Sequence, residues 1–64
     1  MKVLWIKVKN ADGENFQSGR MYAAEDEAGQ YVEDEFGCQW SLSEEGLKDF
    51  LNEGWDIEVE YVHN

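Results

Sequence analysis

The last segment of the chain has the pattern that most restricts its fold. From Trp55 to Tyr61, apolar residues alternate strictly with acidic ones: Trp55, Ile57, Val59 and Tyr61 against Asp56, Glu58 and Glu60. A period of two places the apolar residues on one face of a β-strand and the acidic residues on the other. The pattern therefore predicts a strand with one buried face and one fully acidic, exposed face.

Residues 2–9 alternate in a similar way. We expect a strand whose buried face is formed by Leu4, Ile6 and Val8 and whose exposed face is formed by Val3, Trp5, Lys7 and Lys9. The turn-forming sequence Asn10–Gly13 ends this strand, and a loop follows as far as Gly19. Phe16 is the large apolar residue of this loop, and we expect it to act as an anchor.

Three short segments in the middle of the chain predict further strands, because each lies between glycine-containing turns and holds apolar residues. They are residues 20–26, 31–36 and 38–42. Within the first of them, Tyr22 and Ala24 are expected to face the interior. Strands that are joined by such tight turns pair in an antiparallel manner.

A change of period at Ser43 predicts one helix, at about residues 44–53. Ser43 is a preferred N-cap residue, and Glu44 and Glu45 follow it in the first turn, where the helix dipole favours negative charge. Gly54 suits the left-handed position after the last turn. The apolar residues between these ends have the i, i+3, i+4 spacing of one stripe, formed by Leu47, Phe50 and Leu51.

The chain has 64 residues and one cysteine, so we expect a single domain, residues 1–64, without an internal disulfide. The predicted order is four strands, one helix and a last strand. It indicates a mostly β (α+β) fold, either a small SH3-like antiparallel barrel or a curled five-stranded sheet. The expected core consists of Leu4, Ile6, Val8, Tyr22, Val32, Leu42, Leu47, Phe50, Leu51, Trp55, Ile57, Val59 and Tyr61.

Three motifs follow one another in the first two thirds of the chain. They are the glycine-basic-x-tyrosine sequence Gly19–Tyr22, the acidic turn Glu25–Tyr31 and the Asp-Glu-x-Gly sequence Asp34–Gly37. In this order they resemble the small phage-encoded SH3-like β-barrel proteins, over about residues 2–42. The resemblance implies a phage or prophage origin and a binding role, and it carries over no catalytic residue. The helix before the last strand departs from the pattern of that family.

The charge of the chain is strongly negative and unevenly distributed. Fifteen acidic and five basic residues give a net charge of −10. Lys2, Lys7 and Lys9 occur in the first nine residues without an acidic neighbour, so residues 10–64 carry −13. A negative surface repels phosphate groups, which argues against direct binding of nucleic acid.

The acidic residues of the last strand suggest a different kind of partner. Carboxylates on alternate residues of a strand lie about 6.8 Å apart, close to the span of two successive phosphates at about 3.4 Å each. Asp56, Glu58 and Glu60 form this row, and Glu33 and Glu35 or the turn Glu25–Glu27 are candidates for a second one. Such a phosphate-mimicking face predicts a host protein with a basic surface as partner, for example a nucleic-acid-binding enzyme. The alternative is that the charge only provides solubility.

Neither catalysis nor a metal site is indicated by the sequence. The single histidine, His63, is next to the C-terminus, and Cys38 has no histidine nearby to activate it. One cysteine and one histidine are too few for a structural zinc site. We therefore expect no enzyme, no cofactor and no metal. No apolar segment approaches the roughly 20 residues of a membrane span, and we expect a protein of the host cytosol without a membrane partner.

Aromatic residues supply a second set of candidate binding residues. Trp5 and Trp40 are expected to be partly exposed, and tryptophan is common at the centres of protein interfaces. The main hypothesis is a small acidic binding protein that inhibits or modulates a host protein. The alternative is a small structural or assembly protein that acts as a homo-oligomer, for example a homodimer formed through Trp5 or through an edge strand.

Overall fold

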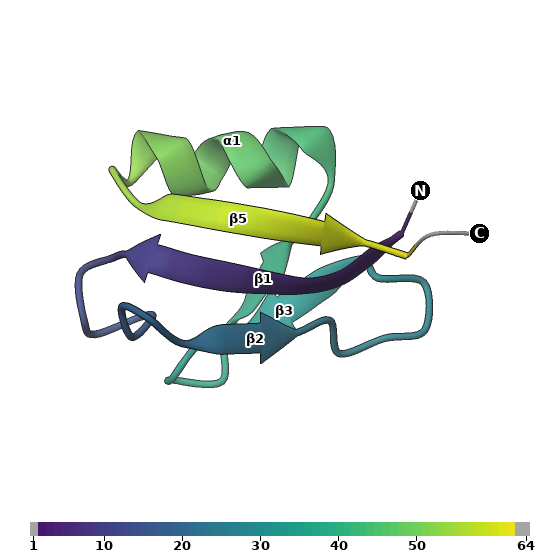
Figure 1. Cartoon of the computed structure of the whole chain (residues 1–64), viewed down its shortest axis with the longest axis horizontal. Coiled ribbons are helices and arrows are strands. Elements are labelled where there is room, and N and C mark those ends of the chain that lie inside the picture. Colours follow the sequence, from purple (N-terminus) through teal and green to yellow (C-terminus); the bar gives the residue numbers. More distant parts are fainter. Residues whose placement is uncertain (1, 63–64) are drawn as a thin grey trace.

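The computed structural model describes residues 2–62, and its elements follow the predicted order (Figure 1). They are β1 (Val3–Asn10), β2 (Met21–Ala23), β3 (Tyr31–Glu33), β4 (Gln39–Ser41), α1 (Glu44–Asn52) and β5 (Asp56–Tyr61). One antiparallel sheet has the order β2-β1-β5, and β3 and β4 form a separate antiparallel pair. Figure 1 shows the three-stranded sheet in front, β3 behind it and α1 beside β5. The mostly β fold with one helix is confirmed, and its strands form two sheets rather than one closed barrel.

The central strand β1 slips by one residue against β5 at two places. At the first of them Leu4 is the extra residue between Val3 and Trp5, which pair with consecutive residues of β5. An inserted residue interrupts the alternation of faces. Val3 is therefore buried, and Leu4 is 49% exposed. The prediction that Leu4 belongs to the core and Val3 to the exposed face is wrong for this reason, whereas Ile6 and Val8 are buried as predicted.

The core is built from both sheets, the helix and one loop. Its buried apolar residues are Val3, Ile6, Val8, Phe16, Tyr22, Val32, Leu42, Phe50 and Trp55. The loop residue Phe16 is fully buried, and its ring centroid lies 5.0–5.9 Å from those of four other aromatic residues, Tyr22, Trp40, Phe50 and Trp55. The expectation that Phe16 anchors its loop is confirmed. Four residues of the predicted core are only partly buried: Leu47, Ile57, Val59 and Tyr61.

Helix α1 begins and ends where the sequence predicts. The Ser43 hydroxyl accepts a hydrogen bond from the backbone N–H of Gly46 (3.1 Å), which satisfies one of the unpaired donors of the first turn. Gly54 follows the helix with a left-handed φ of 82°. Phe50 is fully buried, but Leu51 is 66% exposed. The prediction that Leu51 belongs to the core is therefore wrong, because the helix turns only part of its apolar stripe towards the sheets.

The buried side of α1 comes unusually close to β4. Gly46 is buried, and a Cβ atom at this position would collide with the backbone carbonyl group of Ser41. Glycine inside a helix ordinarily costs about 1 kcal/mol relative to alanine. Here it allows the close approach that places Phe50, one turn later on the same side of the helix, in the core.

Candidate functional site

The acidic strand β5 lies beside the most basic strand of the chain. β5 pairs with β1, so Glu58 stands opposite Lys7, and Glu60 stands opposite Trp5. The ammonium group of Lys9 lies 3.2 Å from the Glu58 carboxylate. Lysine side chains therefore border the row of carboxylates that the sequence suggested, and this row does not form an isolated acidic face.

The charges of residues 2–10, which include β1, and of β5 cancel. Residues 2–10 carry three positive charges, Lys2, Lys7 and Lys9, and β5 carries three negative charges, Asp56, Glu58 and Glu60. The whole net charge of −10 is consequently carried by the rest of the chain. A surface that attracts a basic partner is best sought there.

Glu35, a candidate for a second acidic row, is engaged within the protein. Its Oε1 accepts hydrogen bonds from the Arg20 guanidinium (2.6 Å) and from the Tyr22 hydroxyl (2.7 Å). Burial and the bond to this carboxylate raise the pKa of Tyr22. Glu35 follows β3, which belongs to the other sheet, so the structure does not bring it next to the acidic residues of β5.

An open cleft of about 630 Å³ lies on the β3–β4 pair, and all of its lining residues are uncharged. They are Ala28, Gly29, Gln30, Tyr31, Gln39, Ser41, Leu42 and Ser43. Tyr31 stands opposite Ser41 in the strand register, on the side of the pair that faces away from the buried Val32. The lining comes from residues 28–31 and 39–43, and the second group belongs to residues 36–43, the longest uncharged segment of the sequence.

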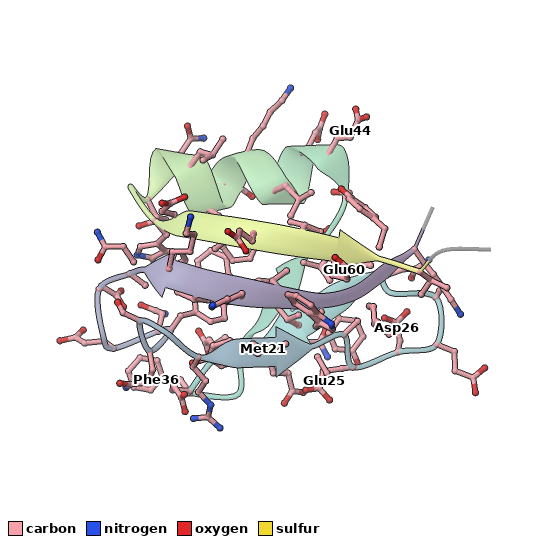
Figure 2. All side chains as sticks on the ribbon, viewed as in Figure 1. Met21, Glu25, Asp26, Phe36, Glu44 and Glu60 are labelled. Carbon is pink, nitrogen blue, oxygen red and sulfur yellow. The ribbon has the colours of Figure 1, made fainter. Side chains whose placement is uncertain are left out.

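Carboxylates surround this neutral cleft. One group, the loop residues Glu25–Glu27, directly precedes the lining residues 28–31, and another, Glu44 and Glu45 of α1, directly follows Ser43. Glu33 is two residues from Tyr31 on β3 and therefore lies on the same face of the strand. Figure 2 shows Asp26 and Glu44 towards the end of the molecule where β5 finishes, and Glu25 just after the end of β2.

We call these six residues the acidic rim: Glu25, Asp26, Glu27, Glu33, Glu44 and Glu45. None of them forms an ion pair within residues 2–62. Lys2 is the cation at this end of the sheet, where its carbonyl oxygen accepts a hydrogen bond from Val62. Lys2 forms no ion pair with the rim, so the rim and the cleft combine six unpaired carboxylates with the hydrogen-bonding groups of tyrosine, serine and glutamine side chains.

Asp34 is a buried carboxylate with a structural task that the sequence analysis missed. Its Oδ1 accepts hydrogen bonds from the backbone N–H groups of Phe36 and Cys38 (both 2.9 Å), and its Oδ2 accepts from the Asn15 amide (3.0 Å) and the Trp40 indole (2.9 Å). Burial alone would raise the pKa of Asp34, but these bonds outweigh it and hold the pKa below its ordinary value. Asp34 therefore fixes the β3–β4 turn and is not free to meet a partner.

The two tryptophans that the sequence suggests as candidate binding residues, Trp5 and Trp40, lie in different surroundings. Trp40 donates to Asp34, and its ring centroid is 5.0 Å from that of Trp55 and 5.6 Å from that of Phe50, so it belongs to the aromatic cluster. Trp5 lies on the outer face of the three-stranded sheet and is half-buried. Of the two, Trp5 is the one on the outer surface.

Comparison of the chain with protein-family models, with curated proteins and with solved structures finds no match. Among residues 2–62, no helix is long and apolar enough to cross a membrane. In the same range, no group of three or more histidine, cysteine, aspartate or glutamate residues is placed to hold a metal ion. His63 lies outside the described residues. Cys38 is a free, exposed thiol.

Proposed function

We propose that this chain is a small acidic binding protein without catalytic activity, and that the cleft and its acidic rim receive a basic segment of a partner protein. The observation that carries the proposal is the position of the rim, whose six carboxylates flank an uncharged cleft and form no ion pair within residues 2–62. Lysine and arginine side chains complement such a surface, and the Tyr31 ring offers a face for a cation.

A partner of this kind is a protein that normally binds phosphate groups. Proteins that bind nucleic acid present lysine and arginine side chains to the phosphate backbone. A carboxylate surface that occupies those side chains would compete with nucleic acid and so inhibit or modulate the partner. The resemblance of residues 2–42 to phage-encoded SH3-like β-barrel proteins supports a phage or prophage origin and a partner in the host cytosol.

The experiment compares two variants with the same net charge. Glu25→Lys/Glu27→Lys changes the acidic rim, whereas Glu14→Lys/Glu53→Lys changes the β1–β2 loop and the end of α1, at the other end of the molecule (Figure 1). Asp26 is left intact, because its carboxylate accepts a hydrogen bond from Gln30 (2.7 Å) and holds the loop. Each immobilised protein is exposed to a bacterial lysate, and bound proteins are eluted with rising salt and identified.

We expect the parent and the Glu14→Lys/Glu53→Lys variant to retain the same nucleic-acid-binding proteins and the rim variant to lose them. Gln39→Lys, which places one cation in the cleft, should also lose them. Equal retention by both double variants would show that the rim is not the recognition surface. The net charge would then serve solubility alone.

A further inference from the structure

The outer face of the three-stranded sheet is a second surface with a different composition. The register aligns Met21 of β2, Lys7 of β1 and Glu58 of β5 in one row, and Ala23, Trp5 and Glu60 in the next. Figure 2 labels Met21 and Glu60, which belong to the two outer strands of this sheet. The face therefore has an apolar column on β2, a mixed column on β1 and an acidic column on β5.

The apolar part of this face is exposed although the core is complete without it. Met21 is 51% exposed, and Leu4, which the bulge removes from the core, is 49% exposed. Ala23 is exposed as well, and Trp5, which stands beside it in the register and follows Leu4 in the chain, is half-buried. Exposed apolar residues that adjoin one another, in contrast to scattered ones, mark surfaces that bind other macromolecules.

Charge decides which partner suits this face. Two copies of a chain with a net charge of −10 repel each other at most orientations. The outer face differs from the rest of the molecule, because the lysines of residues 2–10 balance the acidic residues of β5. A second copy can approach here with the least repulsion, while the acidic rim would remain in solvent.

The arrangement of the columns also matches itself. A twofold axis midway between two facing sheets, parallel to them, perpendicular to β1 and between the two rows, places Lys7 of each copy over Trp5 of the other. The same operation places Met21 over Ala23. Both contacts occur twice, as a twofold interface requires, and an ammonium group over an indole ring is favourable. The β5 columns then face each other at the edge of the interface, with Glu58 over Glu60, and the ion pair of Glu58 with Lys9 reduces the repulsion between them.

We infer that the chain forms a homodimer in which the outer faces of the β2-β1-β5 sheets pack on each other. The inference is independent of the acidic rim and adds an interface to the proposed function. A dimer would also stabilise the fold by mass action, and this matters for a domain of 64 residues, whose small core gives marginal stability.

Sedimentation equilibrium over a wide range of protein concentration tests the inference. We expect the parent to change from monomer to dimer as concentration rises. Met21→Lys should weaken the dimer roughly a hundredfold, about tenfold for each of the two symmetry-related contacts. Lys7→Glu should weaken it as well. The control is Leu51→Lys, which introduces the same charge at another exposed apolar residue, on α1, and should leave the dimer unchanged.

A parent that stays monomeric at every concentration would overturn the inference, and so would equal weakening by Met21→Lys and Leu51→Lys. The dimer should strengthen with added salt, because salt screens the repulsion between the two acidic copies. Partner binding at the acidic rim should weaken with salt, and it should respond to Glu25→Lys/Glu27→Lys but not to Met21→Lys. Failure of one proposal can thus be distinguished from failure of the other.

Discussion

Replacing Asp34 tests whether one buried carboxylate holds the β3–β4 pair on which the cleft lies. Its two oxygens accept four hydrogen bonds, two from backbone N–H groups and two from the side chains of Asn15 and Trp40. Asp34→Asn keeps the shape of the side chain but has only one acceptor oxygen. If that oxygen stays with the backbone, the new amide group faces two donors and loses both bonds.

The magnitude follows from these two lost bonds. Hydrogen bonds to a charged group contribute about 1.5–3 kcal/mol each, so Asp34→Asn should lower the free energy of unfolding by roughly 3 kcal/mol or more. In a domain of this size, 3 kcal/mol corresponds to a decrease of about 12–24 °C in the melting temperature. Asp34→Ala loses all four bonds. It should be largely unfolded, because small domains have stabilities near the low end of 5–15 kcal/mol.

Thermal and urea unfolding monitored by circular dichroism measure both variants, and pH supplies an internal control. Because the pKa of Asp34 is lowered in the folded state, its contribution is present above the unfolded-state pKa of about 3.9 and is lost as pH falls through the folded-state pKa. Asp34→Asn has no such carboxyl group. The difference in stability between the parent and Asp34→Asn should therefore be constant near neutral pH and shrink below about pH 4.

Trp40→Phe provides the matched background, because it removes one donor and keeps an aromatic ring. In that background Asp34→Asn should lower the free energy of unfolding by less than it does in the parent. The reason is that the indole N–H, one of the two donors that would lose its acceptor, is already absent. Two results would show that the carboxylate does not hold the turn. One is a melting temperature of Asp34→Asn within about 4 °C of the parent at pH 7. The other is an equal loss of unfolding free energy from Asp34→Asn in the parent and in the Trp40→Phe background.

Two further predictions concern the packing of α1. Gly46→Ala should destabilise the protein in urea unfolding although alanine favours an ordinary helix by about 1 kcal/mol, because its Cβ would meet the backbone carbonyl group of Ser41. A higher urea midpoint for Gly46→Ala than for the parent would contradict the close approach of α1 to β4. Phe50→Ala should lower the free energy of unfolding by about 3–5 kcal/mol, whereas Leu51→Ala should change it by no more than about 0.5 kcal/mol. Equal effects of the two substitutions would contradict the observed orientation of the helix on the sheets.

Features that depend on neighbouring residues could be predicted from the sequence. The helix has Ser43 and Gly54 at its two ends, and both act within one turn of their own position. The alternation of apolar and acidic residues likewise predicted strand β5 correctly, because a period of two arises within a single strand. The same applies to the order of the elements, since each short segment carries its own pattern and its own turn.

Features that depend on a distant segment could not be predicted in this way. Leu4 leaves the core because β1 slips against β5, and a slip is a property of the pair and not of either strand. Leu51 follows the helical spacing, but the close contact of Gly46 with β4 determines which part of the stripe is buried. For Asp34, the local turn sequence accounts for its two backbone partners, whereas nothing near it in sequence identifies Asn15.

The position of the candidate site also depends on a distant segment, because β1 pairs with β5. Seen alone, β5 has an entirely acidic outer face, but the outer face of a sheet includes the strand that pairs with it, and here that strand brings Lys7 and Lys9. With this face neutralised, six of the twelve other acidic residues lie around the cleft, and these rim residues form no ion pair within residues 2–62. Two surfaces then follow from one charge distribution. The proposed binding of a partner at the rim should weaken with added salt, whereas the proposed dimer should strengthen, so a single salt titration separates the two proposals.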